Sequence, residues 1–208
     1  MRENKFIDHI TELAVSLANC SVTETGLTTI NIEEGINRTV NMLLEAKRQN
    51  RKVLSFGNGG SNAIVNHLQT DLSNTCKIRA VNMSNASILT ALSNDNGYES
   101  VYEQQTELWA EPGDVIVAIS SSGRSGNILS GVKKAVQMGC KVVTLSGFAP
   151  DNPLRAMGDI NYHVSSFSYG FVEAAHSVLV HYITDCAGSL AREGMAGETI
   201  TAKRLVNG

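Results

Sequence analysis

Short apolar runs alternate with helical patterns through most of this chain, and this alternation restricts the fold more than any other feature. The runs with the length of buried strands are Val53–Phe56, Ile78–Met83, Val115–Ile119, Val142–Leu145 and Ile160–Val164. Helical patterns lie between and after them, at about residues 61–73, 84–93, 98–110, 125–138, 153–157 and 170–190. Strands that alternate with helices predict a parallel sheet covered by helices on both faces.

Two helices are predicted before the first of these strands. The apolar side chains of the first helix, from Phe6 to Leu17, fall on one helical face. A turn is expected around Gly26. The second helix is expected to begin after Asn31, because Glu34 stands at the capping-box position.

Composition and charge exclude several classes of protein. With 208 residues, 42% of them hydrophobic, the chain is long enough for one sizeable core. We expect a single domain over residues 1–190, and a polar, glycine-containing tail over residues 191–208 that is loose or docks on a partner subunit. The net charge of −3 argues against non-specific nucleic-acid binding. No apolar run approaches the roughly 18–20 residues of a membrane span.

The expected location of the protein is the cytoplasm. The four cysteines form no CxxC pair, as expected of reduced thiols. The N-terminal residues also lack the apolar block of a signal peptide.

Two turns between a strand and a helix have the composition of phosphate-binding loops. They are Gly57-Asn58-Gly59-Gly60-Ser61 and Ser120-Ser121-Ser122-Gly123-Arg124-Ser125. Glycine lets the backbone approach a ligand, and a helix N-terminus offers free N–H groups and a positive dipole end. Serine hydroxyls can complete a neutral cradle for an oxyanion, to which Arg124 could add charge. Both turns would lie at the carboxyl edge of the sheet, where open α/β sheets bind ligands.

Ordinary helix capping is the alternative explanation of each turn, because Ser and Gly are common between strands and helices. Two such turns at one edge are harder to explain in this way. Neither contains the Gly-Lys-Ser/Thr of a Walker A loop, and residues 81–84 after the second strand carry no acid to hold a ribose. A nicotinamide cofactor is therefore not expected.

Histidine and carboxylate side chains occur together on two of the predicted helices. His67 and Asp71 lie four residues apart, and the last helix carries Glu173, His176 and His181. Imidazole nitrogen with carboxylate oxygen is a common zinc or acid–base set, although such pairs are also ordinary on helix surfaces. Glu173 and His181 are about 12 Å apart along the helix axis. Sharing one ion would therefore need extended side chains or a second subunit. His176 is expected to pack in the core.

Several motifs resemble a known family. GNGGS followed by H-x-x-x-acid, SNDNGYESVY, GDVIVAISSSGRSGNI, GCKVVTLSG and EAAHSVLVH occur in this order within about residues 31–190. Together they resemble the sugar isomerase (SIS) domain, and within it the phosphoheptose isomerase branch. The resemblance implies an α/β three-layer sandwich with a five-stranded parallel, flavodoxin-like sheet preceded by two N-terminal helices. It also implies aldose–ketose isomerisation of sedoheptulose 7-phosphate by a homo-oligomer, usually a tetramer, with active sites at subunit interfaces.

The resemblance assigns roles by position in these motifs. The implied substrate-binding residues are Asn58, Gly59, Gly60, Ser61, Asp95, Ser120, Ser121, Ser122, Ser125 and Glu173. The family's His, Glu, Gln and His ligands of one Zn²⁺ fall on His67, Asp71, Glu173 and His181, so two match and two depart. Asp71 is the implied base and His181 the implied acid, roles that compete with metal binding. Thr75 and Gly170 also depart, from an arginine and an acid in the family.

Two other functions fit the same sequence. An isomerase or epimerase of another phosphosugar would keep the metal and fail with the heptulose. An adaptor or regulatory protein with the SIS fold would bind phosphosugars without catalysis. The presence of His67, an acid at position 71 and His181 argues against an adaptor, whereas the substitutions at positions 71 and 173 argue mildly for one.

Overall fold

A computed structural model describes residues 5–206 of the chain, with side chains up to residue 193. Its sheet has seven strands in the order β2-β1-β7-β6-β5-β3-β4. The strands are β1 Ser21–Glu24, β2 Thr28–Ile30, β3 Val53–Gly57, β4 Ala80–Asn82, β5 Val115–Ser120, β6 Lys141–Gly147 and β7 Ile160–Val164. The sheet is mixed, because β1 and β2 are antiparallel to their neighbours.

The predicted parallel strands form the larger part of this sheet. β4, β3, β5, β6 and β7 pair in parallel in that order. Numbered among themselves, these five strands have the order 2-1-3-4-5, which is the flavodoxin-like order. The chain passes from β3 to β4 on one side and then to β5 on the other side. Such a switch point leaves a crevice at the carboxyl ends of the two central strands.

No local pattern in the sequence predicts the two remaining strands, β1 and β2. The expected turn at Gly26, whose φ is 80°, is the turn of a β-hairpin formed by β1 and β2. β1 pairs with β7 and buries Val22 and Thr23, whereas Thr28 and Thr29 of β2 are exposed. Strands this short, with one of them mostly exposed, give no period of alternation to recognise. The N-terminal region is thus helix, hairpin, helix.

Helices cover both faces of the sheet, as predicted. They are α1 Phe6–Ala18, α2 Ile32–Arg48, α3 Gly59–Asn74, α4 Ala86–Asn96, α5 Val101–Trp109, α6 Gly126–Gln137 and α7 Tyr169–Val206, with the 3₁₀ segments η1 Thr25–Leu27, η2 Tyr98–Ser100 and η3 Pro153–Ala156. Alternate residues of β5 divide between two cores. Val115 and Val117 pack with α2, α3 and α7, whereas Ile116 and Ala118 pack with α5 and α6.

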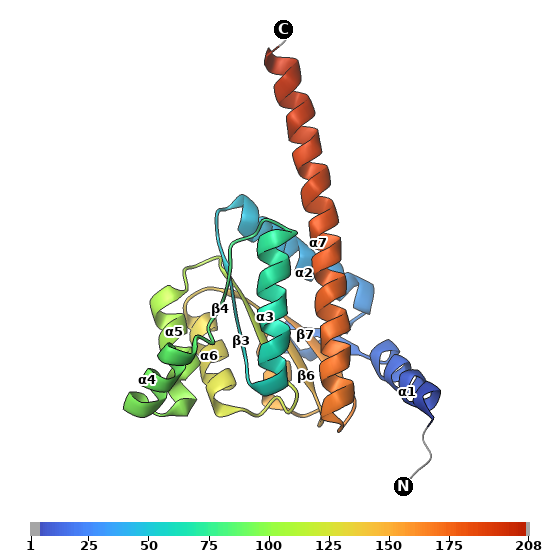
Figure 1. The fold of residues 1–208 in the computed structure, drawn as a ribbon, viewed down its shortest axis with the longest axis vertical. Helices are drawn as coiled ribbons and strands as arrows, with labels where there is room; N and C mark the ends of the chain where they lie inside the picture. Colours follow the sequence, from blue (N-terminus) through green and yellow to red (C-terminus); the bar gives the residue numbers. More distant parts are fainter. Residues whose placement is uncertain (1–4, 207–208) are drawn as a thin grey trace.

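The two terminal helices differ from the expectation in different ways. Phe6 and Ile7 of α1 are 75% and 70% exposed, and only Leu13 and Leu17 of this helix pack against the core. α7 continues through most of the expected tail, and its C-terminal part extends beyond the α/β layers (Figure 1). None of the described helices is both long and apolar enough to cross a membrane.

Candidate functional site

The two glycine- and serine-rich turns meet at the switch point. A cavity of about 270 Å³ lies between them at the carboxyl ends of β3 and β5. It is lined by Asn58, Gly59, Gly60, Ser61, Ser120, Ser121, Ser122, Ser125, Tyr169 and Glu173. All the residues expected to bind substrate are thus brought together here, with the exception of Asp95. Tyr169 is an addition, contributed by the first turn of α7.

The cavity wall consists of neutral hydrogen-bonding groups with one carboxylate. No Lys or Arg is among the described residues that line it. Arg124 is turned outward, where its guanidinium pairs with Asp151 at 2.8 Å. The hydroxyl of Ser121 is buried without a hydrogen-bond partner, although a buried polar group ordinarily has one. An oxyanion in the cavity would give this hydroxyl an acceptor.

The second turn is shaped by Asn152, a residue outside the motifs that predict the site. Gly123 has a φ of 62°, and a Cβ at this position would lie 2.0 Å from the Asn152 side-chain oxygen. The Asn152 side chain is held in place by Nδ2, which donates to Ser146 Oγ and to the carbonyl oxygens of Gly147 and Ala149. Only glycine therefore fits at this point of the turn.

A second group of polar side chains lies where α3 and α7 run side by side (Figure 1). His67 Nε2 is 3.4 Å from one oxygen of Asp71, and His181 Nδ1 is 3.4 Å from the other. Thr184 Oγ1 donates to the same Asp71 oxygen as His181 approaches, at 3.3 Å. One ligand atom from each of His67, Asp71 and His181 lies within 4.8 Å of the others. This donor set of two imidazoles and a carboxylate could hold a divalent metal ion.

Of the four expected metal ligands, Glu173 lies outside this group, and the expected sugar-binding residue Asp95 lies outside both the group and the cavity. The Glu173 carboxylate instead lies against Gly60, where an added Cβ would be 2.4 Å away. Glu173 thus places an anion near the N-terminus of α3, which the helix dipole favours. Asp95 is exposed on α4, where Asn94 Nδ2 donates to it.

His176 is buried in the core, as expected. Its Nε2 is 3.0 Å from the carbonyl oxygen of Ser146, and its Nδ1 is buried without a partner. Burial lowers the pKa of His176 from 6.5 to about 4, with a further lowering from nearby His163. The imidazole is therefore neutral in the folded protein at physiological pH.

This buried imidazole is expected to make the protein sensitive to acid. The unfolded chain takes up a proton at this residue below pH 6.5, and the folded protein does so only near pH 4. The free energy of unfolding should therefore fall as the pH drops through this interval. Between pH 7 and 4.5, wild type should lose about 2 kcal/mol more than His176→Gln, whose amide can still donate to Ser146. Urea unfolding at both pH values measures the loss. The exposed-site control His9→Gln should behave as wild type, and equal losses in all three proteins would contradict this origin.

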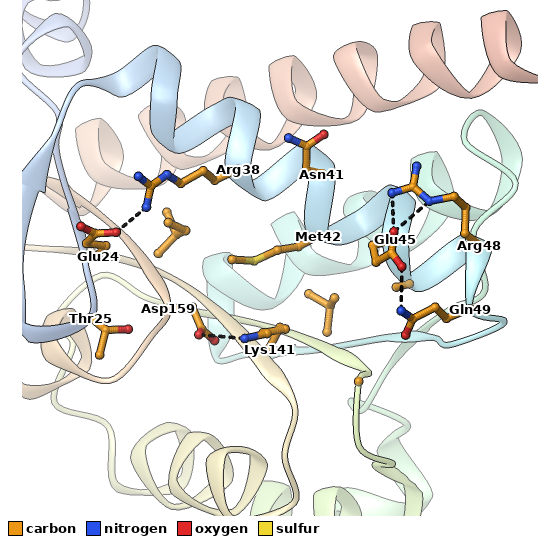
Figure 2. A pocket seen from close by; sticks show the side chains of 14 residues that line it. Glu24, Thr25, Arg38, Asn41, Met42, Glu45, Arg48, Gln49, Lys141 and Asp159 are labelled. Carbon is orange, nitrogen blue, oxygen red and sulfur yellow. Dashed lines mark hydrogen bonds and ion pairs between the residues drawn. The ribbon is translucent and has the colours of Figure 1, made fainter.

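A larger cavity, of about 600 Å³, lies elsewhere (Figure 2). It is at the amino ends of β5 and β6, beneath α2. Figure 2 shows Arg38 beside Glu24 and Lys141 beside Asp159, and both are ion pairs. The charges that line this cavity are thus neutralised within the chain, and it lies at the edge opposite to the one where α/β sheets bind ligands.

Comparisons with known proteins agree with this arrangement. The model of the SIS domain family matches residues 27–147. A phosphoheptose isomerase from Pelobacter propionicus is 35% identical over 69% of this chain and 78% of its own length. One from Helicobacter pylori is 31% identical over 75% of this chain and 84% of its own length. The solved phosphoheptose isomerase from Neisseria gonorrhoeae is 27% identical, with a TM-score of 0.75 over 87% of this chain and 96% of that one.

Proposed function

This chain belongs to the SIS domain family, in its phosphoheptose isomerase branch, and from that premise we propose that it isomerises sedoheptulose 7-phosphate to glycero-manno-heptose 7-phosphate. The observation that carries the proposal is the pairing of two features. A cavity at the switch point that is lined mostly by serines, glycines and an asparagine, with one carboxylate at Glu173, supports recognition of a phosphate ester. The His67–Asp71–His181 group, on the helix that follows the first turn and on α7, supports proton transfer.

The cavity residues bind and orient the sugar phosphate in this proposal. Ser120, Ser121, Ser122 and Ser125 hold the phosphate, and the first turn from Asn58 to Ser61 lines the sugar. Hydroxyl and backbone N–H groups can donate hydrogen bonds to the charged phosphate oxygens, so binding does not require a Lys or Arg side chain. Asp95, exposed on α4, is proposed to hold sugar hydroxyls when the substrate is bound.

Asp71 and His181 supply the proton transfers of an aldose–ketose isomerisation. The reaction passes through an enediol, so that one group moves a proton between two adjacent carbons and another serves the neighbouring oxygen. We assign the first role to the Asp71 carboxylate and the second to the His181 imidazole. Thr184 Oγ1, which donates to Asp71, orients the carboxylate.

One Zn²⁺ per subunit is proposed to be held by His67, Asp71 and His181, with Glu173 as the fourth ligand. When bound, the ion would polarise the carbonyl group of the substrate. Two nitrogens and a carboxylate oxygen within 4.8 Å of one another fit this ion. Any Asp71 oxygen that binds metal is not free to act as the base, so the two roles divide the two oxygens of this carboxylate.

A homotetramer with sites at subunit interfaces is the proposed assembly. His67 and His181 have half-exposed side chains, at 54% and 48%, and Phe6 and Ile7 of α1 leave apolar surface uncovered. A second subunit would cover such groups. The four cysteines are unpaired, which supports the proposed cytoplasmic location.

The first experiment combines metal analysis with turnover. The protein is purified without added metal, zinc per chain is quantified, and conversion of sedoheptulose 7-phosphate is followed with and without a chelator. We expect about one zinc per chain and turnover that the chelator abolishes. His67→Ala should lose the zinc, and His9→Ala, which changes an exposed histidine on α1, should keep it.

The other outcomes favour different functions. Zinc without turnover of the heptulose would favour an isomerase or epimerase of another phosphosugar. Neither zinc nor turnover would favour a non-catalytic adaptor that binds phosphosugars. One observation favours the adaptor: the Glu173 carboxylate lies against Gly60 and outside the group of His67, Asp71 and His181.

A further inference from the structure

One asparagine that precedes a helix in this structure does not cap it. Asn31, Asn85 and Asn152 each accept a hydrogen bond from a backbone N–H of the helical segment that they precede. Asn58 has the same position before α3, but its side chain bonds none of the α3 N–H groups. Asparagine is among the residues that cap helices best, so a specific interaction must draw this side chain away.

The Asn58 side chain instead forms hydrogen bonds with two other residues, Asn127 and Tyr98. Asn58 Nδ2 donates to Asn127 Oδ1, and Asn127 Nδ2 donates back to Asn58 Oδ1, both at 2.9 Å. Tyr98 OH donates to the same Asn58 oxygen at 2.8 Å. The backbone N–H of Ile128 donates to Asn127 Oδ1 and thereby fixes which way the Asn127 amide faces. The Asn58 oxygen, which would otherwise cap α3, thus already accepts two hydrogen bonds.

The result is that the Asn58 side chain leaves the N–H groups in the first turn of α3 uncapped, at the end of the helix where the Glu173 carboxylate also lies against Gly60. These groups have no carbonyl partner within the helix. Gly60 and Ser61, in this turn, line the cavity. An Asn58 side chain in its ordinary capping position would compete with an oxyanion for the same N–H groups.

The amide pair also joins the two turns to each other. Asn127 lies two residues after Ser125, within the first turn of α6, and it is 2% exposed. Its contact with Asn58 crosses from the turn after β5 to the turn after β3. Buried, well-paired amides of this kind hold their surroundings in one arrangement.

We propose that Asn127 and Tyr98 are positioning residues of the anion site. They hold the Asn58 side chain off α3, so that the N–H groups of its first turn stay available to a phosphate or sugar oxygen. The inference rests on the proposed function only in taking an oxyanion as the ligand, and it holds for any phosphosugar.

The test uses Tyr98→Phe, which removes only a hydroxyl from a side chain that is 51% exposed. Calorimetry with inorganic phosphate measures affinity independently of turnover. Tyr98→Phe should weaken phosphate binding about fivefold, the size of effect that one helix cap has on an equilibrium. The midpoint of thermal unfolding should not fall, because the released Asn58 gains a cap. A merely structural hydroxyl would instead lower the midpoint.

A second background isolates the Asn58 side chain. The Asn58→Ala protein has no side chain at this position that could cap α3. Adding Tyr98→Phe to it should therefore leave its phosphate affinity unchanged. Tyr182→Phe, which alters a tyrosine facing Leu17 and Ile32, is the matched control and should bind as wild type does.

Three results would overturn the inference: an unchanged affinity in Tyr98→Phe, the same fivefold loss in the Asn58→Ala background, or no binding of phosphate to wild type. Failure of the proposed function is a separate result. It would appear as absent heptulose turnover in a wild-type protein that still binds phosphate.

Discussion

His181→Ala should lose about a thousandfold in turnover of sedoheptulose 7-phosphate. The imidazole is the proposed acid and a proposed zinc ligand, and general acid–base groups contribute about 10²- to 10⁴-fold on their own. Its side chain is 48% exposed, so its removal should change the free energy of unfolding little. Steady-state kinetics at saturating zinc, with unfolding measured in parallel, separates a lost catalytic group from a lost fold.

Two further variants sharpen this result. His9→Ala removes an exposed histidine from α1 and should retain full turnover. Zinc analysis of His181→Ala then distinguishes the two roles, because a variant that keeps its zinc and still fails has lost the acid. Turnover of His181→Ala within tenfold of wild type would refute the assignment.

Gly123→Ala should destabilise the protein and weaken the phosphate binding that is proposed for the serine-rich turn after β5. Alanine is strained by about 1 kcal/mol or more at a φ of 62°. The new Cβ would also displace Asn152, which is 2% exposed and held by its bonds to Ser146, Gly147 and Ala149. Such overpacking typically costs about 1–3 kcal/mol. We expect a loss of about 3 kcal/mol in the free energy of unfolding, and at least about tenfold weaker binding of inorganic phosphate.

Gly26→Ala is the matched control for this variant. Gly26 has a φ of 80°, but its Cβ would meet nothing within 4 Å, and it lies in the β1–β2 hairpin, outside the cavity lining. Its free energy of unfolding should fall only by the cost of the strained backbone at this φ, and it should bind phosphate as wild type does. Urea unfolding of the two variants gives the comparison, and equal losses would show that contact with Asn152 is unimportant.

The position of the site could be predicted from the sequence because every signal for it is local. A buried run, a glycine- or serine-rich turn and a helix follow one another directly at both turns. The flavodoxin-like order of the strands then places the turns together. The residues that shape the turns were missed for the opposite reason. Asn152 lies about 30 residues after Gly123, and Asn58 and Asn127 are 69 residues apart, so their contacts exist only in the folded chain.

The two strands that were not predicted also have a physical cause. The β1–β2 hairpin is stabilised by pairing with β7, which no local pattern indicates. The tail predicted over residues 191–208, loose or docked on a partner subunit, contains glycines, but glycine weakens a helix by only about 1 kcal/mol per residue. α7 therefore continues to Val206 without contradicting its sequence.

The charge of the cavity wall has a consequence for how fast a phosphosugar would arrive. Electrostatic steering speeds association by attraction between opposite charges, and added salt removes that gain. The described residues of the wall include no Lys or Arg and one carboxylate, that of Glu173, on a chain of net charge −3, so an incoming dianion is repelled rather than attracted. Encounter should therefore be slower than the unsteered rate. Raising the ionic strength screens this repulsion, so the association rate should not fall and should rise modestly.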